Sequence, residues 1–222
     1  MANLKEVRTR IASTQSTQQI TKAMKMVSAT KLRKAQQAII QMRPYADKLN
    51  GILQNLSDSA KDEQSVQGYF EHRDVKNILL VVNSSDRGLC GGFNSNITKE
   101  VTALVEKTYQ GKNVDVKFLG KKAYEFFKRH SFNMDTSSMT IFQDLNADDA
   151  FILGGEIIAD FLNGKYDEVR VVYNKFKNAA TQIVTAEKLL PVELESFESS
   201  DQEKGKYLAD FTFEPSKKDL LF

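Results

Sequence analysis

Residues 32–56 read LRKAQQAIIQMRPYADKLNGILQNL, and apolar side chains recur along them at alternating intervals of three and four. This spacing is the heptad seam of a coiled coil, which needs a partner helix along most of its length. The seam extends to the N-terminus with a shift of one residue in the middle: Leu4, Val7, Ile11, then Ile20, Met24, Val27, then Leu32, Ala35, Ile39, Met42, Ala46, Leu49, Leu53 and Leu56. It predicts one helix from Leu4 to Leu56, which at about 1.5 Å per residue is about 80 Å long. Something outside this chain is expected to cover it.

Two features distinguish the seam from that of a regular coiled coil. Residues 12–19, ASTQSTQQ, are polar and uncharged, and Pro44 lies inside the heptad series. Proline in a helix interior costs about 3 kcal/mol and predicts a kink or break. Because the heptad continues through Pro44, we expect a bent helix. Without a partner helix, Val27, Leu32 and Ile39 are expected to be largely exposed.

The N-terminal stretch is strongly basic. Its first 43 residues hold nine Lys or Arg against one acid, Glu6, which gives +8; the total of +2 leaves −6 for residues 44–222. Such a stretch is also typical of an organellar transit peptide, but the heptad continues past any plausible cleavage point. A basic arm would attract nucleic-acid phosphates as well. Against that hypothesis, the segment has no aromatic residue before Tyr45 and no recognisable reader motif.

Length and composition suit one compact domain beyond this arm. The 222 residues are 41% hydrophobic, no apolar run is long enough to span a membrane, and no signal sequence is visible. A single cysteine, Cys90, rules out an intrachain disulfide and suits a reducing compartment. The two histidines, His72 and His130, form no zinc constellation, so we expect neither a metal nor a cofactor.

After a polar segment, 57–67, strands alternate with helices. Residues 77–82, NILLVV, fit a strand buried on both faces. The further elements are expected in this order: a helix over 94–108, a strand over 114–119, a helix over 120–129, a short strand over 139–142, a helix over 147–161, and strands over 168–173, 182–190 and 207–213. This order predicts an α/β fold, in which the long N-terminal coiled-coil helix precedes a Rossmann-like open, largely parallel sheet with helices on both faces.

The most enzyme-like feature is the turn after the first strand, residues 84–92, SSDRGLCGG. Such turns hold phosphate in many α/β folds, so the alternative function is a small α/β enzyme that binds a phosphorylated ligand at Gly88–Gly92. The match is weak, because the glycine spacing differs from G-x-G-x-x-G and no P-loop lysine follows. The simpler interpretation is a structural turn in which Asp86 and Arg87 pair or cap locally. No motif places a histidine near Cys90, and we expect no catalytic residue.

Two segments closely resemble the gamma subunit of F-type ATP synthases. They are residues 20–36, ITKAMKMVSATKLRKAQ, and residues 84–92. Weaker similarity comes from three further segments: RPY at 43–45, NKFKN at 174–178 and FEPSKKDLL at 213–221. The resemblance covers the whole chain in order, and the first two motifs are specific.

The resemblance implies a rotor, the central stalk of a proton-translocating synthase, with no bond chemistry of its own. It would couple rotation of the membrane c-ring to conformational cycling of the catalytic hexamer of alpha and beta subunits, and it would also bind the epsilon subunit. The implied location is peripheral, on the cytoplasmic side of a bacterial cell membrane, with no transmembrane segment and no nucleic-acid partner. Candidate subunit contacts are Met24, Lys25, Lys31, Asp86 and Arg87.

One departure from the family pattern concerns the shaft. Family members pair the N-terminal helix with a second long helix at the C-terminus, whereas this chain stops at Phe222, where that helix is expected to begin. Half of the shaft is therefore expected to be missing. The expected domains are a shaft helix over 1–57, a linker over 58–75, an α/β domain over 76–214 and the start of a truncated C-terminal helix over 215–222.

Overall fold

The computed structural model describes residues 3–60, 64–130, 132–143, 146–178 and 180–192, with the backbone alone at 50–60 and 64–66. The chain divides into two compact units, Met1–Ser59 and Ala60–Phe222. The predicted strand over 207–213 and the predicted C-terminal helix start lie outside the described residues. The predicted domain boundaries stay predictions.

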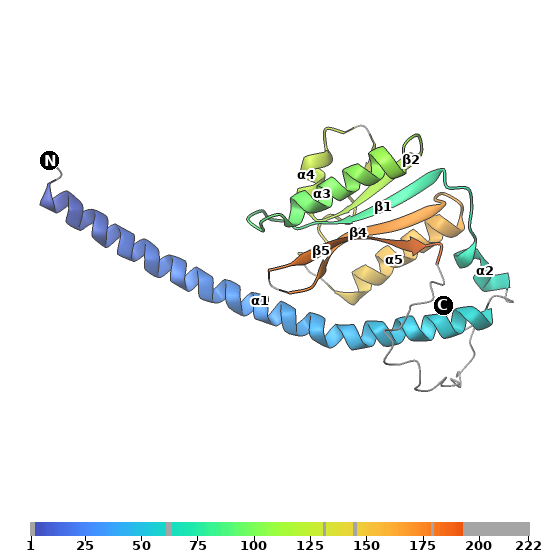
Figure 1. The fold of residues 1–222 in the computed structure, drawn as a ribbon, viewed down its shortest axis with the longest axis horizontal. Helices are drawn as coiled ribbons and strands as arrows, with labels where there is room; N and C mark the ends of the chain where they lie inside the picture. Colours follow the sequence, from blue (N-terminus) through green and yellow to red (C-terminus); the bar gives the residue numbers. More distant parts are fainter. Residues whose placement is uncertain (1–2, 61–63, 131, 144–145, 179, 193–222) are drawn as a thin grey trace. The chain divides into compact units, whose positions relative to one another are not determined.

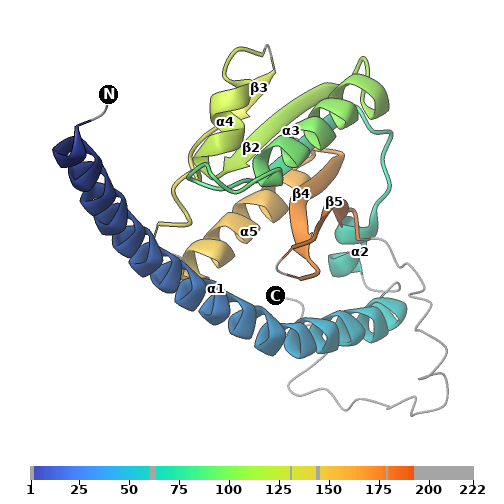
Figure 2. The same ribbon diagram turned by 60° about the vertical axis from the view of Figure 1, so that its left-hand side comes forward.

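The first unit is one helix, α1 (Leu4–Ala60), which contains Pro44 without interruption. Figures 1 and 2 show it curved along its length, as the bent-helix prediction requires. Asn3 directly precedes the helix, and its carbonyl accepts hydrogen bonds from the Glu6 and Val7 amides. Val27 and Leu32 are exposed, as predicted. The prediction for Ile39 was wrong, because that side chain is partly buried.

The second unit alternates helices and strands. Its elements are α2 (Gln64–Phe70), β1 (Asn77–Asn83), α3 (Phe93–Ala103), a π-helical turn η1 (Leu104–Thr108), β2 (Asn113–Leu119), α4 (Lys121–Phe127), β3 (Asn133–Asp135), α5 (Ala147–Leu162), β4 (Glu168–Phe176) and β5 (Gln182–Leu190). Thus α2 and the last residues of α1 fall within the stretch that we expected to be a linker.

Five strands of the described residues form one sheet in the order β3-β2-β1-β4-β5. Neighbouring strands are parallel except β5, which runs antiparallel to β4. In Figure 1, α3 and α4 cover one face of the sheet and α5 covers the other. The prediction of an open, largely parallel sheet with helices on both faces is therefore confirmed.

Strand β1 lies at the centre of the sheet and explains why this fold forms. Its side chains alternate between two cores: Ile78, Leu80 and Val82 pack toward α3 and α4, and Leu79 and Val81 pack toward α5. A continuous apolar run is what a strand covered on both faces requires.

The predicted short strand over 139–142 was wrong. Those residues form consecutive turns, in which the Ile141 and Gln143 amides donate to the Ser138 and Thr140 carbonyls. The apolar side chains of Ile141 and Phe142 instead pack against the core on the α5 side. The strand beside β2 is β3, three residues long, paired through Met134 with Val116.

Candidate functional site

The loop over residues 84–92 follows β1, the strand at which the order of the sheet reverses. Such a point is where ligands commonly bind in open α/β sheets. Three backbone amides fix the start of this loop to its surroundings: Ser84 donates to the Leu119 carbonyl at 2.7 Å, Lys122 to the Ser85 carbonyl at 3.0 Å, and Lys121 to Asp86 Oδ1 at 3.3 Å. The last two bonds join the loop to the first turn of α4.

Asn94, in the first turn of α3, holds the other side of the loop. Its Oδ1 accepts the Ser85 amide at 3.1 Å, and its Nδ2 donates to Ser85 Oγ at 2.8 Å and to Cys90 Sγ at 3.2 Å. The Phe93 amide donates to the Cys90 carbonyl at 3.3 Å. The loop is therefore bonded at both ends to helices that pack on the sheet.

The tip of the loop, Arg87 to Gly92, is exposed. Leu89 and Gly91 have φ values of +63° and +60°, so the backbone turns through the left-handed region. A phosphate site would need amide groups that point at the ligand. Here the Ser85 amide is bonded to Asn94 and the Lys121 amide to Asp86. These bonds suit a structural turn better than a phosphate cradle.

The other candidate contacts lie on α1. Met24, Lys25 and Lys31 are all exposed. Met24 and Lys31 are seven residues apart and so lie on the same face of the helix, whereas Lys25 lies about 100° around it. Asp86 is partly buried and Arg87 exposed, both in the loop of the second unit.

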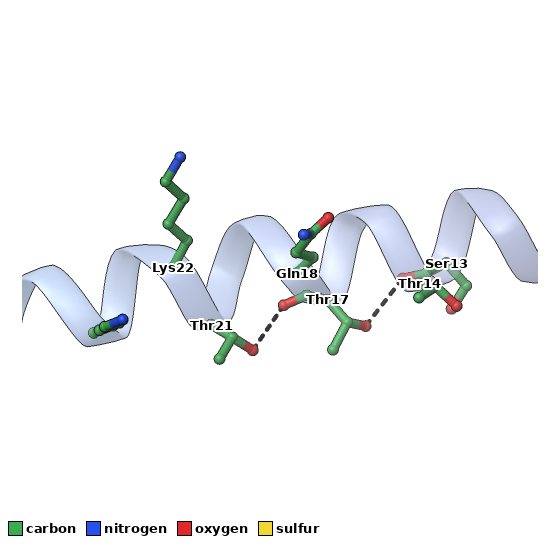
Figure 3. Close-up of a pocket in the computed structure, with 7 residues that line it drawn as sticks. Ser13, Thr14, Thr17, Gln18, Thr21 and Lys22 are labelled. Atoms are coloured by element: carbon green, nitrogen blue, oxygen red, sulfur yellow. Dashed lines mark hydrogen bonds between the residues drawn. The ribbon is translucent and has the colours of Figure 1, made fainter.

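A surface depression on α1 contains one of these candidates. It is lined by Ser13, Thr14, Thr17, Gln18, Thr21, Lys22 and Lys25, all from the same helix (Figure 3). Thr17 Oγ1 donates to the Ser13 carbonyl at 3.0 Å and Thr21 Oγ1 to the Thr17 carbonyl at 2.8 Å. Side chains from one helix do not enclose a small molecule, so this polar surface suits contact with another protein better than a ligand.

A buried ionic cluster that the sequence did not reveal lies at the start of β4. Glu168 is buried and accepts hydrogen bonds from the Tyr109 hydroxyl and from Arg170 Nε. Burial alone would raise the pKa of Glu168, but these bonds and the charges of Arg170 and Lys188 outweigh it and hold the pKa below its ordinary value. Burial and the bond to Glu168 raise the pKa of Tyr109. The cluster is internally paired and joins the end of η1 to the sheet.

A second cluster joins β2, β3 and α5. The buried Lys117 Nζ lies 2.8 Å from Asp135 Oδ2 and 3.4 Å from Glu156 Oε2, and it donates to Ser137 Oγ at 3.2 Å. Burial opposes ionisation of Asp135, but the bonds from Lys117 and Ser137 outweigh it and lower its pKa to about 2. The sequence did not single out Lys117, because a lone lysine between Val116 and Phe118 does not reveal partners from β3 and α5.

The two histidines and the cysteine do not form a catalytic group. His72 Nδ1 lies 2.9 Å from the Phe70 carbonyl oxygen, and His130 stacks on Phe126 with 5.7 Å between ring centroids. Within the described part of the chain, no group of His, Cys, Asp and Glu side chains is arranged to hold a metal ion.

Comparison with known proteins identifies the family. The family model described as ATP synthase matches residues 3–222. The gamma chain of the ATP synthase of Christiangramia forsetii is 48% identical over 221 residues, which are 100% of this chain and 74% of the relative. The chain belongs to the ATP synthase gamma chain family. The gamma chain of Cytophaga hutchinsonii is 45% identical over 225 residues, covering 100% of this chain and 75% of the relative.

A solved structure supports the same assignment. The chain is similar, with a TM-score of 0.50 and 28% identity, to a chain in the central stalk and c-ring structure of the Tetrahymena thermophila mitochondrial ATP synthase. The similarity covers 78% of this chain and 72% of that one. These comparisons confirm the resemblance of the chain to gamma subunits. They do not support an enzyme that binds a phosphorylated ligand at Gly88–Gly92.

As a gamma chain, the protein is a component of ATP synthase, a membrane-associated complex. Among the helices described, none combines the length and the apolar character that crossing a membrane requires.

Proposed function

We propose that this gamma chain is the rotor subunit of a proton-translocating F-type ATP synthase. It couples rotation of the membrane c-ring to conformational cycling of the catalytic hexamer of alpha and beta subunits. The observation that supports this most strongly is the match of the whole chain to ATP synthase gamma chains at 45–48% identity.

The form of α1 suits a rotating shaft. Its apolar seam is largely exposed, including Val7, Ile11, Val27, Leu32 and Leu49, so it is available to a partner helix. A curved helix inside a ring of subunits presents a different surface to each of them. Because a contact that differs between states shifts a conformational equilibrium, turning such a shaft changes the nucleotide affinity of each catalytic site in sequence.

The candidate subunit contacts follow from the same function. We assign Met24, Lys25 and Lys31 to contacts with acidic loops of the hexamer, because a stretch of helix that exposes a thioether and two ammonium groups suits a partly apolar, acidic surface. Arg87 and Asp86 belong to the second contact region. Arg87 is exposed there, while Asp86 also shapes the loop through its bond to the Lys121 amide.

The second unit contacts the remaining partners of the chain. It binds the epsilon subunit and sits on the c-ring, so the chain is peripheral to the membrane, on the cytoplasmic side in a bacterium. The chain performs no bond chemistry: the buried ionic clusters around Glu168 and Lys117 are paired within the fold. Catalysis belongs to the hexamer.

Reconstitution tests this function. The full chain is mixed with alpha and beta subunits of a gamma-depleted bacterial synthase, and ATP-driven rotation is followed by a bead attached to an introduced surface cysteine, with Cys90 changed to Ser. We expect continuous rotation in one direction. Assembly without rotation, or hydrolysis unchanged by adding the chain, would contradict a rotor role.

A further inference from the structure

The outer side of α4 and the residues directly after it carry exposed aromatic rings. On the inner side, Ala123 and Phe127 are buried in the core beside the sheet. On the outer side, Phe126 is 53% exposed. His130 is also exposed and stacks on Phe126, with 5.7 Å between ring centroids and 26° between ring planes. The partly buried Phe132 ring lies 5.8 Å from that of His130.

These rings are held in place by one buried side chain. The centroid of the Phe127 ring lies 4.9 Å from that of Phe126, 5.2 Å from that of His130 and 5.4 Å from that of Phe132. The His130 amide also donates to the Phe127 carbonyl at 2.7 Å. The aromatic surface is therefore organised before any partner binds, and such preorganisation reduces the entropy cost of docking.

The same segment is basic, although the chain beyond residue 43 carries −6 in total. Residues 121–132, KKAYEFFKRHSF, hold four Lys or Arg against one acid, Glu125. Glu125 is already paired with Lys122 at 2.6 Å. Lys128 and Arg129 are exposed beside the rings, and no further acid in their own segment neutralises them. Figures 1 and 2 both show α4 at the periphery of the second unit.

Neighbouring acids do not cancel this charge. Helix α4 starts beside the 84–92 loop, so the residues after it reach the opposite edge of the sheet, where β2 and β3 begin. At that edge, Asp115 accepts a tyrosine hydroxyl and Asp167 accepts two backbone amides of the fold. The exposed acids Asp74 and Glu106 each have an exposed lysine within two residues in the chain. Lys112, exposed just before β2, adds another cation.

We propose that the α4 patch, formed by Phe126, Lys128, Arg129, His130 and Phe132, contacts the anionic headgroups of a lipid bilayer. Ammonium and guanidinium groups bind lipid phosphates, and aromatic rings favour the level of the headgroups. A surface built from one short helix and the turn after it suits a flat bilayer and needs no groove in a partner.

The setting of the chain is consistent with this contact, since ATP synthase is a membrane-associated complex. A fluid layer of lipid has no fixed angular positions, so contact with it is compatible with a turning rotor. The contact is a property of the chain itself and goes beyond the rotor function proposed above.

A fluorophore beside the α4 patch tests the contact directly. With Cys90 changed to Ser, Asn133→Cys places a label next to Phe132 at the start of β3, and Gln182→Cys places the control at the start of β5. Both positions are exposed, and β5 runs antiparallel to β4, so the control lies at the opposite edge of the sheet. The full chain is mixed with phosphatidylcholine vesicles, with or without phosphatidylglycerol, that carry a quencher on their headgroups.

We expect quenching at position 133 to be several-fold stronger than at position 182, and only with vesicles that contain phosphatidylglycerol. The comparison separates the α4 patch from the basic helix α1, which attracts anionic vesicles without placing position 133 against them. Equal quenching at the two positions, or none at position 133, would overturn the proposal.

Charge variants measure the strength of the contact. Lys128→Ser with Arg129→Ser should raise the phosphatidylglycerol concentration for half-maximal vesicle binding by about tenfold or more. Lys175→Ser with Lys177→Ser removes the same charge from exposed positions at the end of β4 and should change it by about twofold or less. Unchanged binding of the first pair, or an equal loss in both, refutes lipid contact by the α4 patch.

Two further measurements separate this contact from structure and from other partners. The unfolding temperature of the Lys128→Ser, Arg129→Ser chain should equal that of the parent chain, because both side chains are exposed. If this variant keeps vesicle binding but loses binding to a soluble acidic peptide, the α4 patch serves a protein and the proposal is wrong. Rotation of the reconstituted complex is a separate readout, so its failure refutes the rotor function and leaves the vesicle result standing.

Discussion

At the scale of single residues, the loop and the start of α4 depend on the absence of a side chain at Gly120. This residue has a φ of +94°, and an added methyl carbon would lie 2.1 Å from the Ser84 carbonyl oxygen and 2.8 Å from its carbon. Ser84 is itself buried, and its Oγ accepts the Ala123 amide at 3.1 Å. The close approach lets the loop bond to α4, and only glycine permits it.

Gly120→Ala should therefore destabilise the chain strongly. The forced positive φ alone costs roughly 1–3 kcal/mol, and the clash with Ser84 adds to it. Gly111→Ala is the matched control, because Gly111 has a φ of +77° but no atom within 4 Å of the added methyl. Chemical denaturation should show a clearly larger loss of unfolding free energy for Gly120→Ala. Equal losses would mean that the contact with Ser84 is unimportant.

The ion pair of Lys117 and Asp135 predicts a dependence of stability on pH. Because the folded pKa of Asp135 is lowered to about 2, its contribution is fully present above the unfolded pKa of about 4. It is lost as the pH falls from about 4 to about 2. In Asp135→Asn the fall of unfolding free energy across this window should be shallower than in the parent chain. Urea unfolding between pH 2 and pH 6 measures it.

An exposed carboxylate provides the control for that experiment. Asp74→Asn, at an exposed position, should leave the slope of the parent chain nearly unchanged. If both variants flatten the slope equally, the Lys117 pair is not its source.

At the scale of elements, the heptad seam of α1 makes a prediction about association. An apolar stripe without a partner tends to cover itself with a second copy, so the isolated chain should self-associate. Ile39 and Ile40 are adjacent and chemically identical, but only Ile39 belongs to the seam. Ile39→Asp should weaken self-association several-fold, and Ile40→Asp, at an exposed position off the seam, should not. Sedimentation velocity distinguishes them, and equal effects would contradict the seam.

How well each element could be predicted depended on its hydrophobic pattern. The apolar run over 77–82 led directly to β1, and the heptads led to α1, which extends four residues beyond the predicted end at Leu56. Strand β3 was missed because Asn133 and Asp135 carry no apolar signal at the edge of the sheet. Residues 139–142 were wrongly predicted to form a strand because Ile141 and Phe142 are apolar. These side chains pack against the core from a turn and do not belong to a paired strand. The pattern marks burial, and burial is not confined to strands.

The site was less predictable than the fold. Residues 84–92 stand out in the sequence, but the strained backbone at Leu89 comes from the bonds around Ser85, Asn94 and Asp86, which connect distant positions. The buried charges of Lys117 and Glu168 were equally hidden, because Lys117 pairs with Asp135 from β3 and Glu168 accepts the hydroxyl of Tyr109, 59 residues earlier in the chain.

At the scale of the whole molecule, the charge distribution predicts how the chain assembles. Residues 1–43 carry +8 and the remainder −6, so a helix with a strong positive field approaches its acidic partners first. Lys25→Glu combined with Lys31→Glu should slow assembly with the hexamer and make it less sensitive to salt. The rate of assembly between about 50 mM and 500 mM salt measures this, since screening grows across that range.

A charge reversal elsewhere on the chain tests the specificity of that effect. Lys107→Glu changes an exposed lysine in η1 and alters the net charge in the same direction. It should affect assembly much less than the pair on α1. If a matched double reversal in the second unit slows assembly as strongly, net charge alone accounts for the result.

The threonines of α1 have a consequence for motion. Thr9, Thr14, Thr17, Thr21 and Thr30 each donate their hydroxyl hydrogen to the carbonyl four residues earlier. These donors are already used within the helix, so a neighbouring surface gains few directional bonds by stopping opposite them. Threonines whose hydroxyl hydrogens are already bonded within the helix therefore add little to any fixed contact that would hold a turning shaft at one angle.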